Sequence, residues 1–360
     1  MPTVVELMSF FEDGWSEKCS EMGIIQRKRE IKTPEDLMFL NLCHLLNGCS
    51  LLDVSAAGKL LRIGDFSDVA YMKKFSQCAG WFEWICEQFA QNTVCGYEKP
   101  TYLEGYRPLA VDATNVTEKG RSGQQFRLHY SIDIFNMNAV SHALTGREVG
   151  ETLRNYDFKK GDLAIGDRIY GTLNGIEHCE NSGADYLLRL RANHFKLYDA
   201  DGKEVDIAAE FQDLQAGACG DLAVFVHLPG GKRLPVRICA KRKSDEEYAH
   251  TLKKLKLSAI NHKSKTKDST KIFNEFFIVA TSLPEKISAF DVLETYRYRW
   301  QIEIYFKRLK SIMDVGDLPK KRTDSSRAWL NGKIMVALMI EFFLSKLAFS
   351  PQGNPPQRVA

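Results

Sequence analysis

The chain is most informative at Thr295-Tyr-Arg-Tyr-Arg-Trp-Gln-Ile-Glu-Ile-Tyr-Phe-Lys-Arg-Leu-Lys310, where the spacing predicts one helix. On a helix that turns about 100° per residue, Arg299, Glu303 and Lys310 fall within roughly 40° of one another. Tyr296 lies close by on the same side. One edge of this helix should be buried, because an apolar stripe runs beside the polar row: Ile302, Phe306, Leu309 and Met313.

A carboxylate flanked by arginine and lysine on a helix has two interpretations. The first is a set of ion pairs at i,i+4 spacing, each stabilising the helix by a few tenths of a kcal/mol. The second is phosphodiester chemistry, in which Glu303 shares divalent metal ions with two further carboxylates beside groups that hold phosphate. Mg²⁺ prefers hard oxygen ligands, so three carboxylates and a substrate phosphate would suffice.

Two further acids stand where short apolar runs end. Leu109-Ala-Val-Asp112 and Asp162-Leu-Ala-Ile-Gly-Asp167 each predict a strand that ends in a carboxylate. Between them, residues 126–135 and 139–145 alternate as strands do, and Val149–Tyr156 predicts a helix. The predicted order is therefore three strands, a helix and a fourth strand, with acids at the ends of the first and fourth strands.

Other polar residues of this region have less specific roles. Asp133, on the second predicted strand, is an alternative ligand if Asp112 is wrongly assigned. His129 and His142 lie in strand patterns, and we interpret both as structural histidines. The turns between these strands are predicted at residues 120–125 and 136–138.

The first 98 residues predict a helical region. Two helices, Asp53–Arg62 and Asp68–Glu87, are separated by a glycine-containing turn, and Ser67 is a good N-cap for the second. This outline is typical of a helix-turn-helix, with Lys73 and Lys74 available for DNA. A plain helical bundle with a solvated lysine pair is the alternative.

The segment from about 185 to 285 predicts strands at 186–191, 222–227, 234–240 and 276–281. Lysine-rich residues 241–271 form either a solvated loop or a phosphate-contacting surface. Arg189 and Arg191, on the first of these strands, face either DNA or solvent. From about 288 to Phe349 the pattern is helical, and a disordered tail is expected over 350–360.

Composition narrows the class of protein without identifying it. The chain has 360 residues, a formal net charge of +3 and nine cysteines without metal-binding or paired spacing. We expect reduced thiols and a cytoplasmic protein, because no signal peptide or membrane span is evident. The apolar run Ile334–Phe349 contains Glu341 and Lys346, which indicates a buried helix.

Taken together, these motifs resemble the bacterial DDE transposases of the insertion sequence 4 family. That family carries Tyr-x2-Arg-x3-Glu-x6-Lys, and Tyr296, Arg299, Glu303 and Lys310 match it without a gap. The second acid lies in a similar setting in Gly166-Asp167-Arg-Ile-Tyr-Gly171. The first lies in Val111-Asp112-Ala-Thr114, where alanine stands at the position that more often holds glycine or serine.

The resemblance implies a ribonuclease-H-like α/β core with a mixed sheet. In that fold the first aspartate lies on strand one, the second follows strand four, and the glutamate lies on a later helix. The implied domains are a helical N-terminal DNA-binding domain, two parts of the core separated by a β-strand insertion, and a tail: 1–98, 99–185 and 287–349, 186–286, and 350–360.

The resemblance also implies a site and a reaction. Asp112, Asp167 and Glu303 would bind two Mg²⁺ or Mn²⁺ ions. The residues implied to contact DNA are Tyr296, Arg299 and Lys310 at phosphates, Trp300 or Tyr170 by stacking, and Lys73 and Lys74. The implied steps are nicking at the terminal inverted repeats, formation of a hairpin, and strand transfer into target DNA by a homodimer. For Trp300 and Tyr170, core packing is the alternative.

Two other functions stay open at this point. One is a metal-dependent nuclease on the same fold that cuts DNA without joining it. The other is an inactive or truncated protein of transposase descent that only binds DNA, although the presence of all three acids argues against an inactive site.

Overall fold

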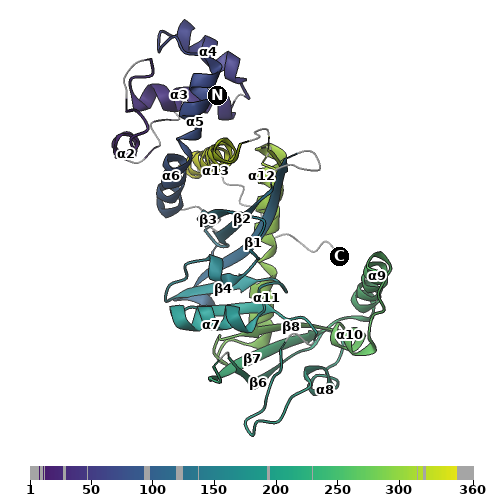
Figure 1. Ribbon diagram of the computed structural model, residues 1–360. Coiled ribbons are helices and arrows are strands. Elements are labelled where there is room, and N and C mark those ends of the chain that lie inside the picture. Colours follow the sequence, from purple (N-terminus) through teal and green to yellow (C-terminus); the bar gives the residue numbers. More distant parts are fainter. Residues whose placement is uncertain are drawn as a thin grey trace. The chain divides into compact units, whose positions relative to one another are not determined.

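A computed structural model of the chain forms two compact units, each described here by itself (Figure 1). The first unit comprises residues 1–98, 113–149 and 304–360, and the second comprises 99–112 and 150–303. The structure describes residues 8, 11, 13–26, 30–46, 48–92, 98–118, 125–136, 138–192, 195–228, 230–313, 315–318 and 322–346. The predicted turn at 120–124 and the tail at 350–360 lie outside these residues.

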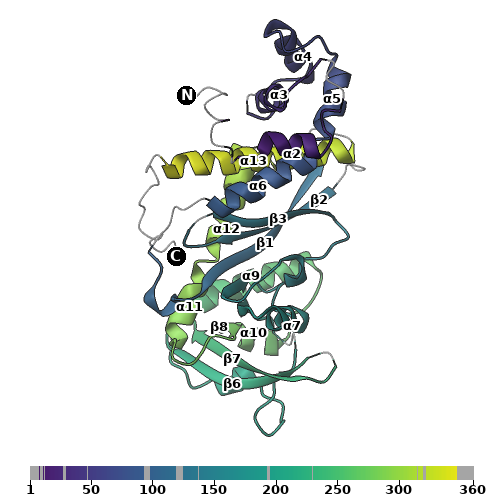
Figure 2. The same cartoon turned by 90° about the vertical axis from the view of Figure 1, so that its left-hand side faces the viewer.

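Helices form most of the first unit. They are α2 (Trp15–Glu21), α3 (Pro34–Leu46), α4 (Leu51–Leu60), α5 (Asp68–Ser76), α6 (Ala79–Asn92) and α13 (Thr323–Lys346). Figure 2 shows α6 and α13 side by side, and α13 also packs on α3 and α5. A glycine permits this approach, because a Cβ on Gly332 would lie 2.6 Å from Leu45 Cδ1 and 3.3 Å from Phe82 Cδ2. The first 98 residues therefore share their core with the C-terminal helix.

The helices predicted near residue 60 are present with one difference. Ser67 caps α5, because its side chain accepts a hydrogen bond from the Ala70 amide. The predicted helix Asp68–Glu87 is wrong as a single element, since it divides into α5 and α6. Tight bonds from Gln77 N to Lys74 O and from Cys78 N to Phe75 O end α5 and redirect the chain.

The first unit also holds part of the sheet. Strand β2 (Gln125–Asp133) pairs with β3 (Asn138–Gly146) antiparallel, and β1 (Arg107–Glu118), which runs through both units, lies next to β2. The end of β1 pairs parallel with β9 (Asp317–Leu318).

In the second unit the strand order is β1-β4-β5-β8-β7-β6. The strands are β4 (Asp162–Gly166), β5 (Asp185–Arg189), β6 (Cys219–His227), β7 (Arg233–Arg242) and β8 (Phe276–Thr281). Strands β1, β4 and β5 are parallel, and β8, β7 and β6 continue the sheet antiparallel. The fold class is thus α/β with a mixed sheet, and the four strands predicted between 186 and 281 are confirmed.

The remaining elements of this unit are helical. They are η1 (Thr101–Leu103), η2 (Leu153–Asn155), α7 (Leu173–Ser182), α8 (Ile207–Glu210), α9 (Asp245–Asn261), α10 (Asp268–Phe273) and α11 (Ala289–Arg297). Figure 1 shows α7 beside the sheet and α9 standing away from it. The segment 241–271 is therefore not a loop, because its greater part forms α9 and α10.

The helix predicted at Val149–Tyr156 is wrong, since only the single turn η2 forms there. Thr152 accepts a bond from the Arg154 amide, and Asn155 Nδ2 donates to the Gly150 carbonyl. Tyr156 is already extended, with φ −126° and ψ 138°. These side-chain bonds satisfy the backbone locally and compete with a helix.

The helix predicted over Thr295–Lys310 is also interrupted. Helix α11 ends at Arg297 and α12 runs over Trp300–Ile312. At the junction Arg299 N bonds Tyr296 O and Ile302 N bonds Arg299 O, a tighter i→i−3 pattern. The apolar stripe on α12 is buried as predicted.

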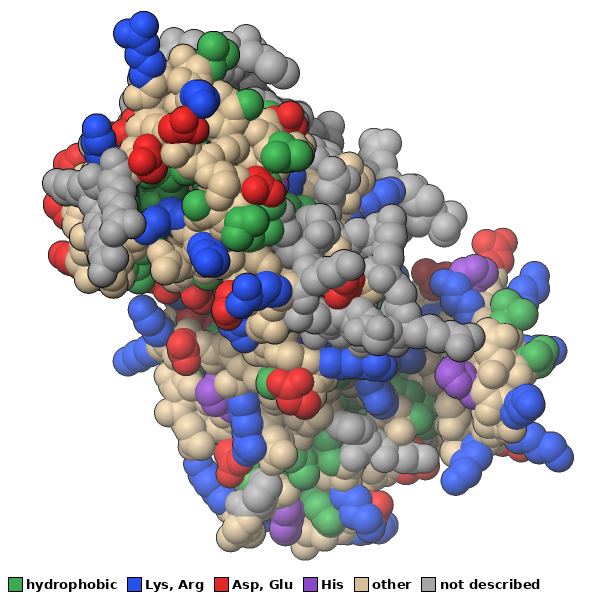
Figure 3. Space-filling model, turned by 45° about the horizontal axis from the view of Figure 1, so that its top comes forward, with side chains coloured by type: hydrophobic (Ala, Val, Ile, Leu, Met, Phe, Trp, Pro, Cys, Tyr) green, Lys and Arg blue, Asp and Glu red, His purple; other side chains and the backbone are tan. Residues whose placement is uncertain are grey.

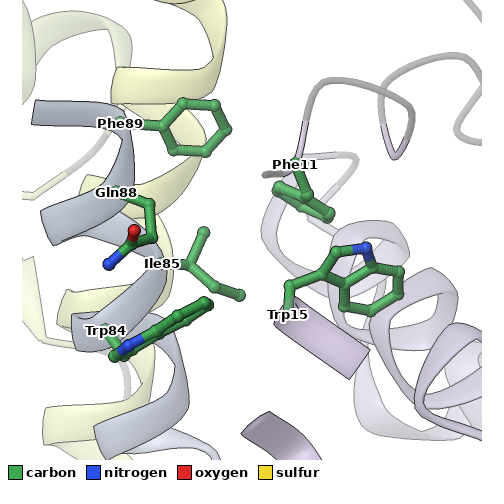
Figure 4. Close-up of a pocket in the computed structure, with 6 residues that line it drawn as sticks. All are labelled: Phe11, Trp15, Trp84, Ile85, Gln88 and Phe89. Carbon is green, nitrogen blue, oxygen red and sulfur yellow. The ribbon is translucent and has the colours of Figure 1, made fainter. Parts of the chain in front are cut away.

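A small gap lined by aromatic residues lies in the first unit, between α6 and the segment that begins α2. Figure 4 shows Trp84 and Phe89 on α6 facing Phe11 and Trp15. The gap has no room for a water molecule, so we treat it as a packing feature. Every cysteine that the structure describes is free. Among these same residues, no helix has the length and apolar character that a membrane span requires.

Candidate functional site

The three acids predicted to act together all belong to the second unit. Asp112 lies in β1, and Asp167 follows the last residue of β4. Because these strands are parallel with Ala110 opposite Ile165, both aspartates stand two residues beyond the same rung of the sheet. Glu303 lies in the first turn of α12. The predicted placement on strand one, after strand four and on a later helix is confirmed.

The turn that carries Asp167 is shaped by glycines. A Cβ on Gly171 would lie 2.4 Å from the carbonyl oxygen of Arg189, and one on Gly166 would lie 2.7 Å from Tyr170 Cβ. The Asp167 carboxylate itself accepts the Ile169 amide at 2.7 Å. Only glycine allows the turn to lie this close to β5, which places Asp167 beside Arg189.

Arg299 connects the acids electrostatically. It forms an ion pair with Glu303, and its side chain is only 13% exposed. Burial lowers the pKa of Arg299, but Tyr296, Glu303 and Asp112 outweigh that effect, so its pKa is raised. The guanidinium is thus held charged among three groups that carry or can carry negative charge.

Tyr296 is a buried phenol beside the Arg299 guanidinium. Its ring lies 5.8 Å from Arg299 Cζ, and its hydroxyl has no well-formed bond within the described residues. Burial raises the pKa of Tyr296 to about 12, so the phenol keeps its proton and can donate it. The Nε atoms of Arg168 and Arg299 are likewise buried and unsatisfied. Such donors are costly unless an acceptor arrives.

The donor set suits a hard divalent cation in kind, since it consists of carboxylate oxygens. Among the residues that the structure describes, however, no three Asp, Glu, His or Cys side chains form a ready metal-binding group. Glu303 is instead paired with Arg299. Carboxylates brought together without a cation repel one another, and pairing with an arginine avoids this repulsion.

The other predicted DNA contacts have different environments. Trp300 is 56% exposed, whereas Tyr170 is fully buried and its hydroxyl lies 3.3 Å from that of Tyr156. Core packing is therefore the correct interpretation for Tyr170. Lys310, farther along α12, is exposed and falls in the first unit. Lys73 is exposed, but Lys74 Nζ donates to the Ile24 carbonyl at 2.5 Å.

The residues interpreted as structural have structural contacts in the first unit. Asp133 caps the turn after β2 by accepting the amides of Phe135 and Asn136, so it does not replace Asp112. Burial lowers the pKa of both His129 and His142 to about 4, and both are neutral at pH 7.

Sequence reasoning missed Lys243 and Phe277, and it assigned no role to Arg168. Arg168 lies in the same motif as Asp167, so its position beside the acids could have been anticipated. Lys243 and Phe277 carry no local signal. They come near Arg189 only because β8 pairs with β5 and β7 pairs with β8.

Known proteins resemble this chain over most of its length. Residues 104–339 match the family described as "Transposase DDE domain". Two similar proteins come from Escherichia coli: the InsL protein of element IS186A in strain K12, and the transposase for element IS421. Each is 27% identical to this chain, in an alignment that spans 96% of this chain and 98% of the relative. The transposase for IS1151 of Clostridium perfringens is 22% identical, over 89% of this chain and 76% of that protein.

Proposed function

Because the chain belongs to the transposase DDE domain family and is an enzyme that acts on DNA, we propose that it moves an insertion sequence. In this proposal it cleaves DNA at the terminal inverted repeats and joins the freed ends to target DNA. The similar proteins are aligned over almost their whole length, which supports the same activity for this chain. The single observation that carries the proposal is the grouping of Arg299, electrostatically coupled to Asp112 and Glu303, with buried Tyr296, which Asp167 also influences.

The core of this enzyme is, in our proposal, ribonuclease-H-like. Along the shared strand β1, the order is β3-β2-β1 in the first unit and β1-β4-β5 in the second. The antiparallel pair β2–β3 and the parallel strands β1, β4 and β5 support this assignment. Residues 186–286 are then the β-rich insertion, and residues 1–98 bind the terminal repeats, with exposed Lys73 as a contact.

Asp112, Asp167 and Glu303 are the residues that would hold a divalent cation, Mg²⁺ or Mn²⁺, and two ions fit the chemistry of a phosphodiester. Bound there, the metal would stabilise negative charge on the phosphate oxygens and favour deprotonation of the attacking hydroxyl or water. Arg299 neutralises Glu303 until the acid is needed as a ligand. Release of Glu303 then leaves the guanidinium free for a phosphate.

Protein side chains position the substrate in this mechanism. Tyr296 donates its phenolic proton to a phosphate oxygen, and Arg299 offers its unsatisfied Nε to the same group. Lys310 contacts a neighbouring phosphate, and exposed Trp300 stacks on a base. A base displaced in this way would permit attack of the 3′ hydroxyl on the opposite strand, which gives a hairpin. Two copies of the chain would bring two ends together.

The decisive experiment measures cleavage of DNA that carries both ends of the element, with Mg²⁺ or Mn²⁺. We expect Asp112→Asn, Asp167→Asn and Glu303→Gln each to lower the rate at least a hundredfold, since each removes a charged oxygen ligand. Glu294→Gln is the matched control, because Glu294 pairs with exposed Arg297 on α11. Its rate should stay near that of the wild type.

Strand joining is measured separately with ends that are already cut. Joined products support a transposase, whereas cleavage without joining would leave a nuclease. If Glu303→Gln cleaves as fast as the wild-type protein, the proposed site is wrong.

A further inference from the structure

Three cations that the mechanism above does not use lie together in the second unit. Arg168 follows Asp167, Arg189 ends β5, and Lys243 follows β7. Asn274 joins two of them, because its side-chain oxygen accepts Arg168 at 3.0 Å and its carbonyl accepts Lys243 Nζ. Four separate segments of chain therefore converge on one point.

The third cation, Arg189, packs against an aromatic ring. The Arg189 guanidinium lies 4.7 Å from the centroid of the Phe277 ring, a cation–π contact. The same ring meets Tyr296 edge-on, with centroids 5.3 Å apart. Phe277 thus links Arg189 to the phenol of the proposed site and limits the directions in which the guanidinium can point.

The cluster has an excess of positive charge. Asp167 acts on the two arginines and Glu247 acts on Lys243, but neither carboxylate forms an ion pair with them. Within the described residues, Arg168, Arg189 and Lys243 form no ion pair with a carboxylate, and Arg168 Nε is buried without any partner. Burial and repulsion from Arg189 and Arg168 lower the pKa of Lys243 to about 8. Partly buried cations that repel one another weaken a fold, so this arrangement favours a bound anion.

We propose that Arg168, Arg189 and Lys243 form a second phosphate subsite, which binds a backbone phosphate of the DNA next to the one held by Tyr296 and Arg299. The subsite rests on the proposed function for the identity of its ligand. Two observations favour phosphate over a small carboxylate. Three separate donors converge, as a phosphate with several acceptor oxygens requires. Asp167 also lies near the two arginines, and its negative charge would repel a weakly held monoanion.

Binding is tested by fluorescence anisotropy with a labelled 40-base-pair duplex in the absence of divalent metal. The variants are Arg168→Gln, Arg189→Gln and Lys243→Gln. Each should weaken binding roughly tenfold, because a charge-assisted hydrogen bond is lost. Each should also reduce the slope of log affinity against log salt by about one, as for one phosphate contact.

Arg233→Gln is the matched control. Arg233 also lies over a phenylalanine, Phe225, at 3.8 Å, but its NH2 group is satisfied by the carbonyls of Asp199 and Ala200. Its affinity and salt slope should equal those of the wild type.

Thermal stability distinguishes a binding role from a structural one. Removing one of three repelling cations should leave the Tm unchanged or raise it, while DNA binding falls. Inorganic phosphate, compared with chloride at equal ionic strength, should raise the Tm of the wild type more than that of Lys243→Gln. A lower Tm for all three variants, with DNA affinity intact, would assign the cluster to folding and overturn the subsite.

Lys243 adds a dependence on pH. Arg189, Arg168 and Glu247 are the charged groups that act on it. The backbone carbonyl of Asn274 accepts a hydrogen bond from its ammonium group. Since its pKa is about 8, affinity should fall between pH 7 and 9 as the ammonium group loses its proton. Lys243→Arg should keep its charge and lose this dependence, and an unchanged pH profile in that variant would contradict the role given to Lys243.

The two proposals fail separately. If the salt slopes change as expected but no cation supports cleavage of element ends, the subsite stands and the transposase proposal fails. If cleavage depends on Glu303 but the slopes of the three variants equal that of Arg233→Gln, the subsite fails alone.

Discussion

At the scale of single residues, the ion pair between Arg299 and Glu303 unites the two interpretations that the helix pattern allows. It is an i,i+4 pair, as on any charged helix, and it is partly buried beside Tyr296 and near Asp112, with 13% of the Arg299 side chain and 34% of the Glu303 side chain exposed. A fully exposed pair with this spacing would add little. Here Arg299 is shielded from solvent, so loss of the Glu303 charge would leave the guanidinium without its partner.

A buried carboxyl in the first unit gives a prediction about pH. Glu341 accepts the Tyr305 hydroxyl at 3.5 Å, and Tyr305 in turn lies 2.7 Å from the Tyr130 hydroxyl. Burial raises the pKa of Glu341 from 4.5 to about 8. Between these pH values Glu341 holds its proton in the folded chain and loses it in the unfolded chain, so the contribution of this carboxyl to the free energy of unfolding should fall as pH rises through the window.

The contribution of Glu341 to the slope should approach about 1.4 kcal/mol per pH unit and vanish above pH 8. Glu341→Gln should remove this contribution, which is the difference in slope between the variant and the wild type in urea denaturation at pH 6, 7 and 8. Glu21→Gln, at an exposed pair with Lys18, is the control and should keep the wild-type slope. An identical slope in Glu341→Gln would show that this carboxyl ionises normally.

At the scale of elements, the break between α11 and α12 alters how the Tyr-x2-Arg-x3-Glu-x6-Lys motif works. Tyr296 lies on α11, Arg299 in the junction and Glu303 on α12. The tighter i→i−3 bonds at the junction bring the three side chains together without one continuous helix. The spacing predicts that these residues act together, and the edge-on contact of Tyr296 with Phe277 adds a tertiary contact beside the junction.

Helix α9 depends on its cap to an unusual degree. None of its residues is buried, and Leu257 and Ile260 are 62% and 71% exposed. Figure 3 shows lysine and arginine side chains projecting from the lobe at the right, where Figure 1 places α9. Ser244 and Glu247 form a capping box at its start.

We therefore expect Ser244→Ala to destabilise α9 by about 1 kcal/mol, because isolated helices depend strongly on their caps. Its amide protons should exchange about fivefold faster, as measured by hydrogen exchange. Ser258→Ala, at an exposed position within α9, is the matched control and should slow exchange slightly or leave it unchanged. Equal exchange in Ser244→Ala and the wild type would mean that another contact holds α9.

At the scale of the whole molecule, the first 98 residues were expected to form a domain of their own. The contacts group them instead with 113–149 and 304–360. Lys333 Nζ donates to the Leu45 carbonyl, and Asn331 donates to the Ala79 carbonyl at 3.1 Å. Helix α13 thus supplies both apolar surface and hydrogen bonds to the N-terminal helices.

We predict that a fragment of residues 1–98 does not unfold cooperatively by itself, because it lacks the surface that α13 covers. Circular dichroism during heating should show a broad, non-sigmoidal loss of helix, whereas the full chain gives a sharp transition. A sharp transition in the fragment would establish an independent N-terminal domain.

The sequence by itself determined what depends on local pattern. The strand that ends before Asp167, the spacing around Glu303 and the cap at Ser67 all follow from short-range periodicity and side-chain chemistry. The strand predicted to end at Asp112 continues instead to Glu118, because its last residues pair with β9. The tertiary structure alone decided which distant residues share a site. Lys243 and Phe277 reach Arg168 and Arg189 because β5, β8 and β7 are neighbours in one sheet. No local propensity encodes that pairing, because strand order is set by the burial of the whole sheet.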